Sequence, residues 1–322
     1  MAKIKLALIV FLGALLLAAG AAPAAAKDTV RIGYLQADIH QLACWVAIEK
    51  GFYTEQGLTV EVAGIFRAGP EEMSAFAAGA LDMGYVGEAP ATVAVANGTA
   101  KVTVVAQVNT EGSAIVVRRD SPLKAVAGLK GKTVAVPGHS TVQDFLLKKA
   151  LAQAKLPLNQ VKTMVLKPPE MIGALRGSQI DAFVAWEPYP AKAATMGVGR
   201  SLITSGKIWP DHPCCVLVVD NKFLAAHPKR VARMVAAHVK ATDFINQHPA
   251  EALKIGMRYT GMDRATVKMA MANVNYTYKI SLAGEKEYVQ FLDKLGYIKV
   301  PDADAFIKRF INPAILREAT AR

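Results

Sequence analysis

The chain has 322 residues, of which 52% are hydrophobic and 20% are charged, and its formal net charge is +12 at pH 7. This length accommodates two domains of ordinary size, and the composition excludes an intrinsically disordered chain. Basic residues are scattered through the sequence, with no basic stripe and no aromatic platform, so nucleic acid is not expected as a partner. The charge favours anionic ligands or anionic membrane surfaces only mildly.

Residues 1–26 have the pattern of a cleaved secretory signal peptide. Lys3 and Lys5 precede an apolar run over 6–19, and three alanines at 24–26 precede Lys27. A retained membrane anchor is the alternative, but the apolar run is short for a membrane span. No cysteine follows the run, so a lipid-anchored N-terminus is not expected. We therefore predict an exported, periplasmic protein that begins at Lys27.

Strand and helix patterns alternate in the first part of the chain. The pattern predicts strands over 29–35, 58–65 and 82–87, with helices over 43–57 and 69–80 between them. The first helix is expected to end at Gly57, and the second carries a proline and two glutamates in its first turn, as helix N-termini prefer. This β-α-β-α-β order predicts a parallel, right-handed α/β unit with helices on both faces.

A second unit of the same kind follows. It has predicted strands over 132–138, 161–167 and 180–186, and predicted helices over 140–156 and 168–179. The segments "EEMSAFAAGALDMGYVGEAP" and "PEMIGALRGSQIDAFVAWEP" both run from a helix through a small turn and a buried strand to a corner with an acid and a proline. The two segments therefore indicate two α/β lobes of similar architecture.

The last third of the chain is strongly helical, with predicted helices over 228–248, 249–260, 263–272 and 284–295. Amphipathic helices are only marginally stable alone, so this segment is expected to pack on the first lobe. The predicted division is 27–112 for the first part of lobe 1, 113–213 for lobe 2, and 214–322 for the second, helical part of lobe 1.

Six segments occur in an order that carries a resemblance: "RIGYLQ", "AIEKGFYTEQGLTVEV", "AAGALDMGYVGEAPATVAVANG", "VVRRDSPLKAVAGLKGKTVAVPGHS", "AFVAWEPYPAKA" and "NKFLAAHPKRV". Over nearly all of residues 27–322 the chain resembles the substrate-binding proteins of bacterial ABC importers. It is most similar to the nitrate, sulfonate, taurine and bicarbonate branch, whose fold is shared by thiamine-precursor-binding proteins.

The resemblance implies a type II periplasmic binding protein: two doubly wound α/β lobes, joined by a two-strand hinge, close around a ligand cleft. It also implies a monomer that delivers its cargo to an ABC permease and ATPase complex at the inner membrane.

The corner Gly87-Glu88-Ala89 is the first candidate ligand site. In open α/β sheets, ligands lie outside the carboxyl ends of strands, where helix N-termini present unpaired N–H groups to an anion. Gly87 allows close backbone approach, Pro90 suits the first helical turn, and the amides of Ala89 and Thr92 would face the anion. A carboxylate beside a bound anion is unfavourable, so Glu88 either contacts a cationic group of the ligand or only caps the helix.

Other predicted corners converge on the same cleft by the same reasoning. Ser140 or Thr141 is a natural helix N-cap, and Ser140→Ala is expected to weaken solute binding while leaving the fold intact. Trp186 offers a flat apolar wall, with a place in the core as its alternative. The remaining ligand-binding candidates are Gln36, His40, Gln41, His139 and Glu187.

The three cysteines, Cys44, Cys214 and Cys215, form no disulfide framework. The segment 211–217 lies where the chain would cross back between the lobes, so its two cysteines are candidates to border the cleft. Together with His40, His139 and His212 the cysteines could build a soft-metal or thiol-reactive site. Their spacing matches no compact metal motif, so packing at the hinge is favoured and neither a metal nor a cofactor is expected.

An enzyme is the second class of function considered. The sequence has no G-x-S-x-G elbow, phosphate-binding loop or HExxH motif, and a Cys–His nucleophile would require Cys44 or Cys214 to meet His40, His139 or His212. The related thiamine-pyrimidine synthesis enzymes do not fit an exported chain, so no catalysis is expected. The sequence therefore predicts an extracytoplasmic solute-binding protein for a small sulfonate-, nitrate- or bicarbonate-like anion. A ligand-binding sensory protein, a thiamine-precursor-type binding protein and a metal binder are the alternatives.

Overall fold

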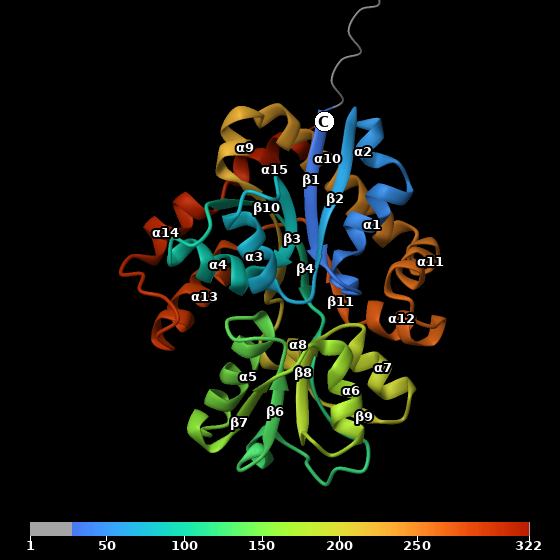
Figure 1. The fold of residues 1–322 in the computed structure, drawn as a ribbon, viewed down its shortest axis with the longest axis vertical. Helices are drawn as coiled ribbons and strands as arrows, with labels where there is room; N and C mark the ends of the chain where they lie inside the picture. Colours follow the sequence, from blue (N-terminus) through green and yellow to red (C-terminus); the bar gives the residue numbers. More distant parts are fainter. Residues whose placement is uncertain (1–27, 322) are drawn as a thin grey trace, which may run out of the picture.

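The computed structural model describes residues 28–321 as two α/β lobes, one above the other in Figure 1. The predicted signal peptide, residues 1–26, lies outside the described residues. Within 28–321, no helix has both the length and the apolar character that crossing a membrane would take.

The first lobe is built on a six-stranded mixed sheet. β1 pairs in parallel with β2 and β3, whereas β10 and β11 pair antiparallel to their neighbours. All five residues of β3 are buried, as expected of a strand covered on both faces. In sheet order the strands are β11 (Val274–Tyr276), β4 (Val102–Glu111), β10 (Pro213–Asp220), β3 (Met83–Gly87), β1 (Asp28–Leu35) and β2 (Leu58–Phe66).

Helices from both ends of the chain cover this sheet. In the first half they are η1 (Ile39–Gln41), α1 (Leu42–Glu49), α2 (Phe52–Glu55), α3 (Gly69–Ala77) and α4 (Glu88–Ala96). In the second half they are α9 (Asn221–Ala226), α10 (Pro228–Gln247), α11 (Pro249–Thr260), α12 (Arg264–Met271), α13 (Leu282–Lys294), α14 (Ala303–Phe310) and α15 (Pro313–Thr320). α10 packs on α1, α13 packs on α4, and α15 packs on β4. The helical C-terminal segment therefore packs on the first lobe.

The second lobe has a five-stranded sheet in which β6 pairs in parallel with β7 and β8, and β5 pairs antiparallel with β8 and β9. In sheet order the strands are β7 (Lys162–Val165), β6 (Thr133–Val136), β8 (Ala182–Trp186), β5 (Ser113–Arg118) and β9 (Gly199–Thr204). Its helices are η2 (Val126–Leu129), α5 (Val142–Gln153), η3 (Leu158–Gln160), α6 (Pro168–Arg176), α7 (Tyr189–Thr195) and α8 (Ser205–Ile208). The predicted α/β fold with two lobes is confirmed.

Two sequence-based expectations about helices need correction. The single helix predicted over 43–57 is wrong, because the chain breaks at Gly51, whose φ of 74° lies in the left-handed region, and restarts as α2. No range was predicted for the helices α7, α8, α9, α14 and α15. The other helices for which a range was predicted agree with it to within a few residues, and α10 and α11 each begin at a proline, as expected of first helical turns.

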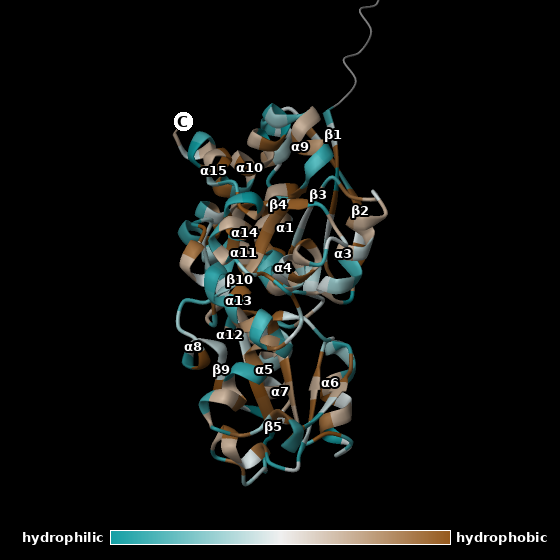
Figure 2. Ribbon diagram, turned by 90° about the vertical axis from the view of Figure 1, so that its left-hand side faces the viewer, coloured by the Kyte–Doolittle hydropathy of each residue, from teal (hydrophilic) through white to brown (hydrophobic). Residues whose placement is uncertain are grey.

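The chain crosses between the lobes twice, at neighbouring places in the fold. It leaves the first lobe from β4 through Gly112 into β5, and it returns through 209–212 into β10, the antiparallel partner of β4. Apolar strands fill the interior of both lobes, and the polar residues lie mainly on the outer surfaces of the helices (Figure 2). The two crossings place the ends of β4, β10 and β3 at the boundary between the lobes.

Polar side chains of the two lobes form contacts across this boundary. Arg67 of lobe 1 forms an ion pair with Glu170 of lobe 2 at 2.8 Å, and Lys167 of lobe 2 contacts Glu71 of lobe 1 at 2.5 Å. The helical C-terminal segment adds two hydrogen bonds to lobe 2. Lys192 of lobe 2 donates to Asp263 at 2.9 Å, and the Tyr297 hydroxyl donates to Asp144 of lobe 2 at 2.7 Å. The structure therefore shows the lobes in contact, with the cleft between them narrowed to a small cavity.

Candidate functional site

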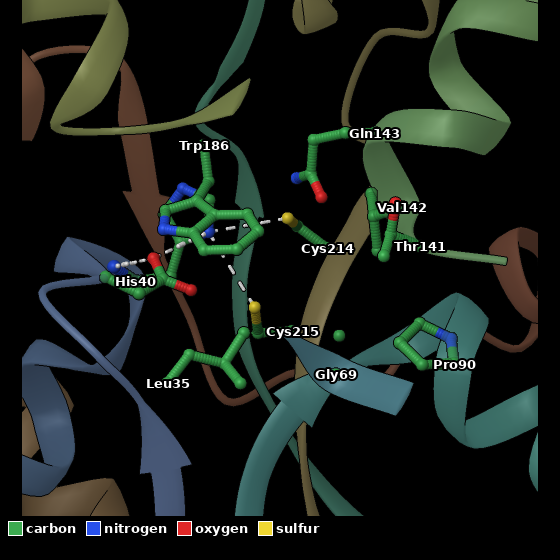
Figure 3. Close-up of a pocket in the computed structure, with 12 residues that line it drawn as sticks. Leu35, His40, Gly69, Pro90, Thr141, Val142, Gln143, Trp186, Cys214 and Cys215 are labelled. Atoms are coloured by element: carbon green, nitrogen blue, oxygen red, sulfur yellow. Dashed lines mark hydrogen bonds and ion pairs between the residues drawn. The ribbon is translucent and has the colours of Figure 1, made fainter. Parts of the chain in front are cut away.

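The cavity lies between the lobes, at the carboxyl ends of strands from both sheets (Figure 3). It encloses about 10 Å³, which is about the space that one water molecule requires. Its walls come from both lobes and from the returning crossing segment. The lining residues are Leu35, Asp38, His40, Gly69, Gly87, Pro90, Thr141, Val142, Gln143, Trp186, Cys214 and Cys215.

Three helices begin at this cavity. Gly69 is the first residue of α3, Gly87 is the N-cap of α4, and Thr141 is the N-cap of α5. The first N–H groups of a helix have no partner within the helix and carry a partial positive charge. At Gly69 a Cβ would lie 2.5 Å from Cγ of Pro90, so glycine is required for this close approach. The three helix starts together make the cavity suited to a negatively charged group.

The other walls are mainly apolar. Leu35, Pro90, Val142 and Trp186 supply hydrocarbon surface, and the Gln143 amide is held by a 3.0 Å bond to Oγ of Ser113. The Trp186 indole is 3% exposed, and its Nε1–H has no hydrogen-bond acceptor among residues 28–321. Among residues 28–321, neither lysine nor arginine lines the cavity. A bound anion would therefore be held by N–H groups rather than by lysine or arginine side chains.

A cluster of four buried side chains forms one side of the cavity. Nδ1 of His40 lies 3.4 Å from Oδ1 of Asp38, 3.5 Å from Sγ of Cys214 and 3.7 Å from Sγ of Cys215. On the other side of the ring, Nε2 lies 2.9 Å from the carbonyl oxygen of Gly112. Figure 3 shows both sulfur atoms pointing toward the imidazole.

The electrostatics of this cluster favour a charged histidine. Burial lowers the pKa of His40, but the neighbouring Asp38 and Cys214 outweigh burial and raise it to about 9. Burial raises the pKa of Asp38 to about 6, although the histidine opposes this effect. Burial also raises the pKa of Cys214, but Cys215 and the His40 charge together hold it well below its usual range. The raised pKa of His40 and the lowered pKa of Cys214 both favour a positive imidazole beside a negative sulfur.

Four of the predicted ligand residues line the cavity: His40, Gly87, Thr141 and Trp186. Thr141 is the helix cap, since its Oγ1 accepts from the Asp144 amide at 3.2 Å. His139 and Ser140 instead line a second cavity of about 340 Å³ between the β6–α5 turn and helices α3 and α4. This second cavity shares Pro90 with the first.

The other predicted ligand residues do not line the cavity. Gln36 is exposed and Ala89 is buried. The Gln41 amide donates to Oδ2 of Asp38 at 3.1 Å. Glu187 accepts hydrogen bonds from the Ala191 amide at 3.0 Å and the Asn273 side chain at 2.7 Å. Glu88 is fully buried, and its carboxylate accepts from the Gln107 amide at 3.2 Å.

Several lining residues were not among the sequence-based candidates: Leu35, Asp38, Gly69, Pro90, Val142 and Gln143. Local signals existed for three of them. Asp38 lies two residues before His40 in the same loop, and Gly69 and Gln143 lie in first helical turns that follow strands. Among the cysteines and histidines considered for a metal site, Cys44, His139 and His212 do not join the cluster of His40, Cys214 and Cys215.

The fold and the cavity define a class of protein: a two-lobed binding protein with its site between the lobes. The crystal structure of the periplasmic nitrate-binding protein of Synechocystis matches this arrangement with a TM-score of 0.82 at 19% identity, covering 92% of this chain and 89% of that protein.

The sequence comparison narrows the class to a family. The model of the NMT1-like family matches residues 23–256, and the chain belongs to this family. A candidate binding protein of Brucella abortus is 30% identical over 246 residues, covering 76% of this chain and 75% of that protein. A candidate aliphatic sulfonates-binding protein of Bacillus subtilis is 30% identical over 249 residues, covering 76% and 73%. The predicted resemblance to this branch of importer binding proteins is confirmed.

Proposed function

We propose that this protein is the extracytoplasmic solute-binding component of an ABC importer, which captures a small anion between its two lobes. The observation that carries the proposal is the cavity at which α3, α4 and α5 begin, because three helix N-termini, each the positive end of a helix dipole, border one space there. We further propose that the unpartnered N–H of Trp186 serves the solute as an additional donor. A nitrate, a bicarbonate or the head group of a sulfonate presents the oxygen acceptors that such donors require.

Capture requires the lobes to separate and close again. The enclosed space of about 10 Å³ is too small for a polyatomic anion, so the solute would enter a more open form and widen the closed one. Closure would be stabilised because contacts from both lobes reach the solute only when the lobes meet. The crossings at Gly112 and at 209–212 are the natural hinge for this motion.

The relatives support the same proposal. Their names describe binding proteins, including proteins for aliphatic sulfonates and for nitrate. On this basis we propose a periplasmic location, delivery to a permease and ATPase complex, and no catalytic activity. A ligand-binding sensory protein would use the same closure, and a permease-reconstitution assay separates the two because only an importer component supports uptake.

A thermal-shift screen against nitrate, bicarbonate, taurine, alkyl and aryl sulfonates and thiamine precursors, all in the presence of EDTA, tests the proposal. A ligand at 100 times its Kd stabilises the folded state by about 2.7 kcal/mol, which raises the melting temperature measurably. Stabilisation by one class of anion supports the proposal and identifies the solute class. The absence of stabilisation by every anion at millimolar concentration would contradict it.

A pair of tryptophan variants localises the site. Trp186→Phe keeps an apolar wall but removes the N–H donor, and a hydrogen bond to a charged group contributes about 1.5–3 kcal/mol, so anion affinity should fall at least tenfold. Trp45→Phe is the matched control, because Trp45 is also buried with an unpartnered Nε1 but lies in α1, away from the cavity. Equal affinity in wild type and Trp186→Phe would remove Trp186 from the site.

A further inference from the structure

The side chains of His40, Cys214 and Cys215 bring three metal-binding atoms together at one wall of the cavity. Nδ1 of His40 and the two Sγ atoms all lie within 4.8 Å of one another, and the three residues are 0–2% exposed. They come from two places in the sequence, the loop after β1 and the start of β10. Figure 3 shows the three groups converging on a common point beside the cavity.

An irregularity in β10 makes the two-thiol arrangement possible. Consecutive residues of a regular strand point to opposite faces of the sheet, so adjacent cysteines would normally point apart. The register between β10 and β4 shifts on both sides of Cys215, which pairs with Asn109, whereas Val216 pairs with Gln107. Such bulges re-aim side chains and often occur beside functional sites. Here both thiols reach the same imidazole.

The histidine is held in the orientation of a metal ligand. The carbonyl oxygen of Gly112 can only accept a hydrogen bond, so Nε2 of His40 carries a proton and donates it at 2.9 Å. Nδ1 is therefore the atom that faces Cys214 and Cys215. Histidine ligands of metals characteristically donate their second N–H to a carbonyl or carboxylate in this way.

The charges around Nδ1 call for a cation. Nδ1, the two sulfur atoms and Oδ1 of Asp38 are all electron-rich, and they meet in a buried place where such atoms repel one another strongly. A proton on Nδ1 relieves this repulsion in part, and a divalent metal ion with two thiolates relieves it fully, because one 2+ ion and two thiolates are neutral together.

We propose that Nδ1 of His40 and the Sγ atoms of Cys214 and Cys215 bind a thiophilic metal ion such as Zn²⁺, with a fourth coordination position open to the cavity. Zinc–sulfur and zinc–nitrogen bonds of about 2.3 and 2.0–2.1 Å in a tetrahedron place nitrogen and sulfur about 3.6 Å apart. The observed N–S separations of 3.5 and 3.7 Å fit this geometry, and the two Sγ atoms, which a tetrahedron places about 3.8 Å apart, lie within 4.8 Å of each other. Asp38 lies beside the ligands, where its Oδ1 accepts a hydrogen bond from the backbone amide of His40 at 3.0 Å.

The open position faces the cavity, whose 10 Å³ accommodates one water-sized ligand. Three protein ligands and one exchangeable position are the arrangement of zinc sites that bind an exogenous group. The metal would therefore lie where a solute donor atom enters. This inference does not depend on the anion-binding proposal, because the three ligands are complete without any solute.

Cobalt(II) substitution tests the proposal directly. The full chain, reduced and freed of metal with a chelator, is titrated with Co²⁺, and sulfur-to-cobalt charge-transfer absorption with tetrahedral d–d bands at one equivalent per chain is the expected result. Competition with a chromogenic chelator then gives the zinc affinity. Cys214→Ser and Cys215→Ser should each lower the affinity by more than the about 10–100-fold that loss of an outer-shell partner costs.

Cys44→Ser is the matched control, since Cys44 is equally buried but lies in α1 outside the cluster, and this variant should keep the wild-type cobalt spectrum. Absence of charge-transfer absorption in wild type, or its persistence in the Cys214→Ser/Cys215→Ser double variant, would overturn the proposal. Should the variants fail to fold, X-ray absorption of the zinc-loaded wild type must still show two sulfur ligands per zinc, and any other sulfur count overturns it. The anion screen is carried out in EDTA, so its result does not depend on whether the protein binds a metal.

Discussion

Glu88 occupies the corner where an anion is proposed to bind, yet its side chain lies inside the first lobe. Its Oε2 accepts from the Gln107 amide, and its carboxyl interacts with that of Glu285, which is also fully buried. Burial raises the pKa of Glu88 to about 7 and raises the pKa of Glu285 well above its usual value. We predict that Glu88 is a buried structural carboxyl rather than a ligand contact, and that Glu88→Gln stabilises the fold at high pH.

Thr92 links the two carboxyl groups. Its hydroxyl donates to Oε1 of Glu285 at 2.8 Å and lies 2.9 Å from the Glu88 carbonyl oxygen. This hydrogen bond lowers the pKa of Glu285, but burial and the neighbouring Glu88 outweigh it, so the pKa remains raised.

The pH dependence follows from these pKa values. In the unfolded chain Glu88 loses its proton near pH 4.5, but in the folded protein only near pH 7. Between these values the unfolded state binds fewer protons, so the stability of the wild type falls as pH rises from about 4.5 to 7 and then stays at the lower level. One pKa unit corresponds to about 1.4 kcal/mol, so the rise from 4.5 to about 7 limits this loss to about 3.5 kcal/mol for Glu88.

Glu88→Gln keeps the shape of the side chain and removes its ionisation. In urea unfolding at pH 5 the variant should match the wild type within about 1 kcal/mol, and at pH 8 it should be more stable by about 1–3 kcal/mol. Glu170→Gln, at a half-exposed ion pair, is the control and should show no such crossover. Equal destabilisation of Glu88→Gln at both pH values, or loss of anion affinity without a change in stability, would refute the structural role and restore Glu88 as a ligand residue.

Two further predictions concern the hinge and the closed state. Gly112→Ala should destabilise the protein by more than the about 1–2 kcal/mol expected from its φ of 84°, because the new Cβ would lie 2.2 Å from Nε2 of His40. The same variant should also distort the cobalt spectrum. The control is Gly98→Ala, at a position with a similar φ but open space around it, and an equal loss of stability in both variants would contradict this reasoning. Arg67→Ala combined with Lys167→Ala removes both ion pairs across the cleft, so small-angle scattering should show a larger radius of gyration and anion affinity should fall a few-fold. High salt screens these ion pairs in the wild type, so it should remove the difference between wild type and variant. An unchanged radius and affinity in the variant would mean that these exposed pairs do not hold the lobes together.

The sequence was informative wherever structure depends on neighbouring residues. The alternation of short apolar runs with amphipathic segments predicted β1, β2 and β3 and the helices between them, because strand and helix periodicity is a local property. Strands β4 and β5 were not assigned, since they form one continuous β-rich segment that divides between two sheets at Gly112. Only pairing with β10, about a hundred residues later, decides where the first lobe ends.

The same distinction explains which site residues could be found. Gly87, Thr141 and Trp186 end strands or begin helices, and the general geometry of α/β sheets brings such positions to one cleft. The direction of a side chain depends on residues distant in the sequence and could not be predicted from the local pattern. Glu88 therefore follows the predicted strand as expected, but its side chain points away from the cavity, toward Gln107. Glu187 likewise turns to Asn273 of the helical segment, which arrives from lobe 1.

The cluster around His40 shows where spacing arguments fail. His40 and Cys214 are 174 residues apart, and compact metal motifs depend on ligands that share one loop or one helix turn, so no spacing rule connects them. Two features of tertiary structure make the contact: the antiparallel pairing that seats β10 between β3 and β4, and the register shift that turns both thiols to one side. A proline precedes the two cysteines in "DHPCCVL", and it pairs out of register with Thr110. The segment that returns the chain from lobe 2 thereby presents both sulfur atoms to the cavity between the lobes.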